Sequence, residues 1–152
     1  VRRTRSEYEQ TFRALGMQPI FVAMPSPAEL RGVIDDVSRQ GARALMVRPD
    51  PFFESNGEQI TRGATELGLP PMTEGRLFVE AGALASYAPK SAEVRRQTAA
   101  LVDKILRGAK PGDLPIQQPT EFEFVVNLTT AKMLGISIPP AVLQRADQVM
   151  PE

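Results

Sequence analysis

Charged and hydroxyl side chains follow three short apolar segments of the chain, and their types and spacing favour ligand binding. Ser26 follows the first segment, Arg48 and Asp50 follow the second, and Glu74 follows the third. A guanidinium pairs with a carboxylate and a carboxylate pairs with an ammonium group, while a hydroxyl at a helix start adds a hydrogen-bonding group. If the segments are neighbouring strands, this set predicts a site for a small zwitterion.

Each of these residues also has a purely structural interpretation. Ser26 is suited to cap a helix, and Asp50, which lies between two prolines, is suited to a turn. Arg48 and Glu74 are equally suited to solvated loop ends. The sequence leaves both interpretations open for all four.

Tyr87 is one of only two tyrosines and lies in a segment of small residues, 82–88. It either contacts a ligand in a cleft or fills the core. Glu121 and Glu123 lie two apart, on one face of an expected strand. Without a third acid or another metal ligand, they indicate a solvated sheet face rather than a metal site.

The residue types that are missing exclude several classes of protein. The chain has 152 residues and no Cys or His, which excludes a Ser-His-Asp triad, a thiolate nucleophile, a disulfide and a His/Cys zinc site. No glycine-rich phosphate loop is present, and we expect no cofactor. A small α/β enzyme that uses Asp50 and Glu74 is disfavoured. The 18 basic and 18 acidic residues give a net charge of zero, which argues against a nucleic-acid partner.

The elements that position these residues alternate between apolar runs and amphipathic helices. Ile20–Met24, Ala44–Val47 and Leu69–Thr73 predict buried strands. The helices before and between them are marked by a capping box at Ser6 and Glu9, by an apolar stripe of Leu30, Val33, Ile34 and Val37, and by Ile60, Ala64 and Leu67. This order predicts the α/β class, with a Rossmann-like parallel sheet flanked by helices.

The second half of the chain does not continue the regular alternation of strands and helices. We expect a strand or loop over 82–88, a long helix capped by Ser91 that ends at Gly108, and a Pro-rich linker over 110–119. A strand over 122–127, a short helix over 129–134 and a last helical piece over 142–149 follow.

Several segments resemble one bacterial family in the same order. Residues 78–87, with Ser86 and Tyr87 at their end, then 102–111, 113–132 and 135–147, resemble ABC-transporter substrate-binding proteins of the periplasmic binding protein type I fold. The resemblance implies two α/β lobes with a solute in the cleft between them, and no enzymatic activity. Only the carboxyl-terminal half is matched. It implies a second-lobe unit over 1–81, a strand and helix over 82–110 that belong with the first lobe, and a return segment over 111–152.

The resemblance also implies a function and a set of residues. The loop from Asp50 to Asn56, Glu74, Ser86 and Tyr87 would face the cleft and bind a small organic solute such as an amino acid. The partner would be the membrane permease of an ABC importer, in the periplasm or cell envelope, although this chain shows no signal peptide. The alternative is an effector-sensing domain of a regulator with the same fold. Because this incomplete lobe would expose apolar surface in 82–107, we also expect either self-association into a homo-oligomer or a local rearrangement of this segment against the chain's own lobe.

Overall fold

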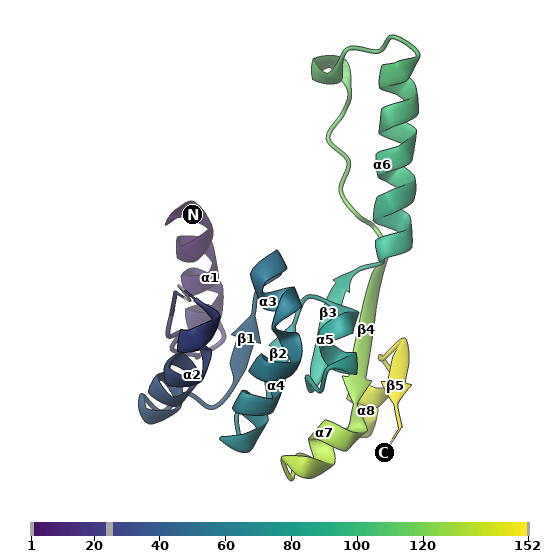
Figure 1. Cartoon of the computed structure of the whole chain (residues 1–152). Coiled ribbons are helices and arrows are strands. Elements are labelled where there is room, and N and C mark those ends of the chain that lie inside the picture. The colour runs from purple at the N-terminus through teal and green to yellow at the C-terminus, as the bar shows by residue number, and fades with distance from the viewer. Residues whose placement is uncertain (1, 24–25, 152) are drawn as a thin grey trace.

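A five-stranded, mostly parallel sheet forms the centre of the molecule in the computed structural model, which describes residues 2–23 and 26–151. The strands lie side by side in chain order: β1 (Leu45–Val47), β2 (Pro71–Thr73), β3 (Ala85–Pro89), β4 (Phe122–Asn127) and β5 (Gln148–Met150) (Figure 1). Strands β1, β2 and β3 are parallel, β4 runs antiparallel to β3, and β5 is parallel to β4. The predicted α/β class is confirmed, and the β3–β4 pair is the exception to a fully parallel sheet.

The helices are α1 (Arg2–Ala14), α2 (Leu30–Arg39), α3 (Pro51–Ser55), α4 (Gly57–Glu66), α5 (Arg76–Glu80), α6 (Ser91–Leu106), α7 (Leu128–Met133) and α8 (Pro140–Leu143). Single 3-10 turns lie at Pro27–Glu29 and Pro111–Asp113. Within the described part of the chain, no helix has the combination of length and apolar character needed to cross a membrane.

Helices α2, α4 and α5 pack on one face of the sheet and form the core with it. Leu30, Ile34 and Val37 of the predicted α2 stripe are buried, and only Val33 is half-buried. Leu30 packs in one cluster with β1, α4 and α5 side chains, while Ile34 and Val37 pack in another with Ala64 of α4. The 3.6-residue spacing of the α2 stripe therefore gives the helix a single buried face.

Residues 90–121 form an arm that extends beyond the sheet. The arm consists of α6, the turn at Pro111–Asp113 and an extended segment that returns to β4 (Figure 1). Several of its apolar side chains are exposed: Val102 is 49% accessible, Leu106 82% and Ile116 96%. The expected exposure of apolar side chains in 82–107 is therefore found along α6.

The predicted strand at Ile20–Met24 is wrong for residues 20–23, which have no regular structure; Met24 lies outside the described residues. Ile20 and Val22 are 38% and 44% exposed, and β1 is the outermost strand at that edge of the sheet. An apolar run becomes a strand only where another strand takes up its backbone hydrogen bonds. The outer edge of β1 is open, but no backbone hydrogen bond of the described residues joins 20–23 to it.

Two predicted helix starts are also wrong. Helix α1 begins at Arg2, so Ser6 and Glu9 lie inside it and cannot form a capping box. Helix α6 takes Lys90 as its cap residue, and Ser91 is its first helical residue. In both cases the backbone enters the helix before the hydroxyl-bearing residue, so the side chain that suggested a cap lies too late in the helix.

The chain after Pro139 differs from the prediction as well. Helix α8 ends at Leu143, and Val149 lies in β5 rather than in a helix. Val126 of β4 pairs with Val149. The open edge of β4 thus takes up a segment whose sequence also suits a helix, because backbone pairing outweighs weak local propensity.

Candidate functional site

The carboxyl ends of β1 and β2 bring two of the predicted site residues together. Val47 and Thr73 are paired in the parallel register, and Arg48 and Glu74 follow them directly. Ligands of open parallel sheets bind outside the carboxyl ends of the strands. Opposite charges therefore lie on adjacent strand ends, as the sequence predicted.

A third residue joins this pair across the molecule. The Tyr8 hydroxyl of α1 donates a hydrogen bond to Glu74 Oε1 at 3.0 Å, and the Arg48 guanidinium carbon lies 5.2 Å from the centre of the Tyr8 ring. We call these three residues the Tyr8–Arg48–Glu74 cluster. The sequence analysis missed Tyr8, because the contact spans 66 residues and no local pattern marks it.

The backbone that carries Glu74 is fixed by its neighbours. The buried Thr73 hydroxyl donates to the Gly75 carbonyl at 3.1 Å and lies 3.4 Å from the Gly75 amide nitrogen, which donates back to it. Thr73 is itself part of the β1–β2 ladder. Glu74 is therefore held in a tight turn at the end of a sheet strand rather than on a long loop.

Asp50 and Asn56 lie around the short helix α3, where the sequence suggested a loop. Asp50 caps α3: its Oδ1 accepts a hydrogen bond from the Phe52 amide at 2.9 Å. Asn56 directly precedes α4, and its side-chain Nδ2 donates a hydrogen bond to the Phe52 carbonyl at 2.8 Å. Both residues follow β1 at the same edge of the sheet as Arg48, and both use a side-chain group to hold the backbone of α3.

The remaining predicted site residues are not in this cluster. Ser26 donates to the Glu29 carboxylate at 2.5 Å and makes no cap hydrogen bond to the helix backbone. Ser86 is 1% exposed and pairs with Thr73 and Val125 in the middle of the sheet. The structure therefore places Ser86 away from solvent.

Tyr87 lies on the opposite face of β3 from Ser86 and is 56% exposed. Its ring stacks on Phe122 with 5.3 Å between centroids and meets Phe124 edge-on at 6.4 Å. Phe122 is itself 40% exposed. Tyr87 therefore belongs to an aromatic surface at the base of the arm, neither in the core nor alone.

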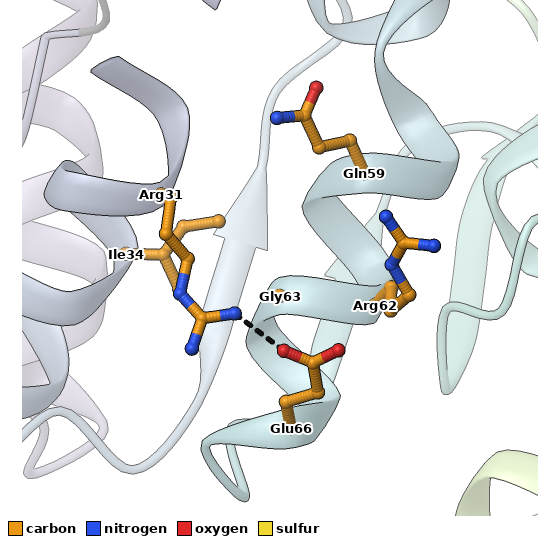
Figure 2. Close-up of a pocket in the computed structure, with 6 residues that line it drawn as sticks. All are labelled: Arg31, Ile34, Gln59, Arg62, Gly63 and Glu66. Carbon is orange, nitrogen blue, oxygen red and sulfur yellow. Dashed lines mark hydrogen bonds and ion pairs between the residues drawn. The ribbon is translucent and has the colours of Figure 1, made fainter. Parts of the chain in front are cut away.

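One pocket lies elsewhere, between α2 and α4, with a volume of about 320 Å³ (Figure 2). It is lined by Arg31, Ile34, Gln59, Arg62, Gly63 and Glu66, and an Arg31–Glu66 ion pair spans it at 2.5 Å. None of the predicted site residues lines it. Of those residues, only Asn56 reaches a second pocket, of about 290 Å³. No group of three or more His, Cys, Asp or Glu residues gathers as a metal site among residues 2–23 and 26–151.

The contact with Glu74 gives Tyr8 an unusual titration. Burial raises the pKa of Tyr8 above its ordinary value of 10.0, and the hydrogen bond and negative charge of Glu74 raise it further, while Arg48 lowers it. The folded protein thus holds this proton more tightly than the unfolded chain does. The stability that this linkage contributes is complete below about pH 10 and is lost as the pH rises through the folded pKa of Tyr8.

This titration can be measured directly, because the chain has only two tyrosines. In a Tyr87→Phe variant, the tyrosinate absorbance near ~295 nm reports Tyr8 alone, and we expect its midpoint above the ordinary tyrosine value of about 10. Adding Glu74→Gln removes the negative charge and should lower that midpoint. Adding Glu58→Gln, on the exposed first turn of α4, is the control and should leave it unchanged. A midpoint insensitive to Glu74→Gln would contradict the contact.

Comparison with known proteins identifies what this arrangement is similar to. Residues 6–150 match the family model described as ABC transporter substrate binding protein. No sequence among the curated proteins matches this chain.

Three solved structures are similar to the chain over nearly its whole length. One is a conserved domain protein from Vibrio cholerae (26% identity, TM-score 0.88, 96% of this chain), and another is an ABC domain in complex with L-Trp from Streptococcus pneumonia (25%, 0.85, 97%). A ligand-free, open substrate-binding protein with adhesive properties from Clostridium difficile is similar in fold (22%, 0.69, 97%). The chain spans about half the length of each, namely 49%, 52% and 48%.

Proposed function

This chain belongs to the ABC transporter substrate-binding protein family, and we propose that it supplies one wall of a cleft that captures a small organic solute for an ABC import system. The wall is the edge of the sheet where β1, β2 and β3 end. The work proposed is binding and release, which requires closure of a cleft and no bond chemistry.

One observation carries this proposal: Arg48 and Glu74 lie at adjacent strand ends, with Tyr8 holding Glu74. A guanidinium and a carboxylate at neighbouring positions match the two charges of an amino acid, because the guanidinium pairs with its carboxylate and Glu74 with its ammonium group. Both residues directly follow a strand of the sheet, so the site needs little ordering when a solute binds.

The similar structure from Streptococcus pneumonia supports an amino acid or a related zwitterion as the solute. That protein is in complex with L-Trp, which carries both a carboxylate and an ammonium group. The exposed Tyr87–Phe122 surface offers this chain a stacking partner for an aromatic or apolar side chain. Solute contacts by Asp50 and Asn56 belong to the same proposal.

A membrane permease as partner and a periplasmic or cell-envelope location follow from the family and remain part of this proposal. Self-association through the exposed apolar side chains of the arm also stays a prediction. Leu106 and Ile116, the most exposed of them, are the residues through which a second copy would be expected to pack.

Calorimetric titration tests the proposal on the chain itself. We expect heat of binding from at least one member of a panel of free amino acids, and none from the same compounds with both charged groups blocked. Circular dichroism of the same sample shows that the chain is folded. A folded chain that binds no amino acid and no other zwitterion of the panel would overturn the proposal for this chain.

A further inference from the structure

The arm, residues 90–121, leaves and re-enters the sheet at one place. Its two connections are β3 and β4, which are antiparallel neighbours with Pro89 paired to Phe122. One limb of the arm is α6 and the other is the return segment after Asp113 (Figure 1). Any turning of the arm against the sheet must pass through the residues that follow Pro89 and precede Phe122.

A buried carboxylate joins the two limbs at this place. Glu93, in the first turn of α6, is 4% exposed. It accepts hydrogen bonds from the Thr120 hydroxyl at 2.8 Å, the Thr120 amide at 3.3 Å and the Glu121 amide at 2.8 Å. Gln97, one turn further along α6, donates to it at 2.7 Å. Four donors therefore converge on one side chain, and three of them come from the return segment.

These donors explain why a charged group is buried here. A carboxylate leaves water at a large cost unless hydrogen bonds replace its hydration. The bonds from Glu121 and Thr120 hold the pKa of Glu93 below its ordinary value although burial acts in the opposite direction, so it stays ionised at neutral pH. An apolar side chain at this position would leave the two backbone amides without their acceptor.

Other contacts between the limbs gather at the same level. The Lys90 amide donates to the Glu121 carbonyl at 2.9 Å, and the Lys90 and Arg96 side chains each lie 3.7 Å from the Glu121 carboxylate. These ion pairs are exposed and contribute little. Further along the arm, side chains such as Leu106 and Ile116 are largely exposed. The buried connection between the limbs is thus at the base, and Glu93 is its centre.

We propose that Glu93 is a positioning residue that joins the two limbs of the arm into one body, so that α6 and the return segment turn together against the sheet when the cleft opens and closes. The opening and closing rest on the proposed function, whereas the joining of the limbs does not. Tyr87 and Phe122 lie on β3 and β4 next to the base of the arm. A change in the arm's orientation therefore takes place beside the aromatic surface that these two residues form.

Spin-label distances measure this joining directly, because the chain has no Cys of its own. In the full chain, labels at Lys104→Cys on α6 and Gln118→Cys on the return segment, both exposed positions, report the separation of the limbs. We expect a narrow distribution of limb distances with Glu93 present and a clearly broader one in Glu93→Gln. The side-chain NH2 group of this variant replaces one acceptor oxygen and faces a backbone N–H that needs an acceptor. Hydrogen exchange of the Thr120 amide or the Glu121 amide, whichever faces the new NH2 group, should accelerate at least about tenfold in the variant, since these amides donate to different oxygens of Glu93 and Gln retains only one.

Two further variants keep the outcome decisive. Glu58→Gln removes a carboxylate from the exposed first turn of α4 and should change neither measurement. Thr120→Val retains Glu93 and removes one donor, and should broaden the distribution to a smaller extent even if Glu93→Gln does not fold. A role in stability alone would lower the melting temperature and leave the limb distance of the folded variant unchanged. That result, in either folded variant, would overturn the proposal, and since no solute is added it is independent of the binding test.

Discussion

Replacing Asn127 by alanine should lower the free energy of unfolding by about 2–4 kcal/mol, because two buried backbone groups lose their partners at once. Asn127 is the last residue of β4 and is 8% exposed. Its Oδ1 accepts from the Thr130 amide at 3.0 Å and its Nδ2 donates to the Val79 carbonyl at 3.1 Å, both within the interior. One side chain thus caps α7 and fastens it to the end of α5.

Chemical denaturation of the variants measures this effect, and two comparisons separate its causes. Asn56→Ala is the matched control, since Asn56 is half-buried and makes one such bond, to the Phe52 carbonyl. It should cost no more than about 1 kcal/mol. Asn127→Asp keeps the acceptor for Thr130 and loses the donor to Val79. If Asn127→Ala and Asn56→Ala cost the same, the interior bonds of Asn127 do not stabilise the fold as described.

The elements that local pattern determines were predicted well. The α2 stripe and the strand at Phe122–Asn127 are confirmed, since their spacing and composition have one interpretation. Elements that form only by pairing with a neighbouring strand were not predicted correctly. Ile20 lies in an apolar run that does not pair with the open edge of β1, whereas Val149 lies in a segment of helical character that pairs with β4. Which edge of a sheet is free is a property of the assembled fold, and no short stretch of sequence contains it.

In the candidate site, too, some features follow from the local sequence and others depend on the assembled fold. The predicted parallel strands placed Arg48 and Glu74 at neighbouring strand ends, and the register of β1 and β2 confirms this position, whereas ligand binding by these residues stays a prediction. The donor from Tyr8 depends on where α1 lies against the sheet, which its own sequence does not determine. Ser86 and Tyr87 were predicted to face the cleft together, but adjacent residues of a strand point to opposite faces, and only Tyr87 is exposed.

Arg48→Gln should weaken the binding of an amino acid by about 10- to 100-fold, which corresponds to about 1.4–2.7 kcal/mol. The reason is specific to one end of the solute, because the guanidinium at the end of β1 is proposed to pair with the carboxylate. The same substitution should therefore change little in the binding of the corresponding amino-acid amide, which carries no negative charge. Arg62→Gln changes an exposed residue of α4 that lines the pocket between α2 and α4; it is the control for loss of a positive charge and should leave both affinities unchanged.

The two ligands and two proteins form a cycle that tests the pairing itself rather than the general importance of Arg48. A local distortion of the strand end would weaken the binding of the amino acid and of its amide equally, whereas loss of the ion pair with Arg48 would weaken only the binding of the amino acid. Glu74→Gln should give the mirror result with an N-acetyl amino acid, which keeps the carboxylate but has no ammonium group: it should weaken the binding of the amino acid and change little in the binding of the N-acetyl derivative. Equal losses for the amino acid and its amide in Arg48→Gln, together with equal losses for the amino acid and its N-acetyl derivative in Glu74→Gln, would mean that Arg48 and Glu74 support the strand ends without touching the solute, and the cleft wall would have to lie elsewhere on the sheet edge.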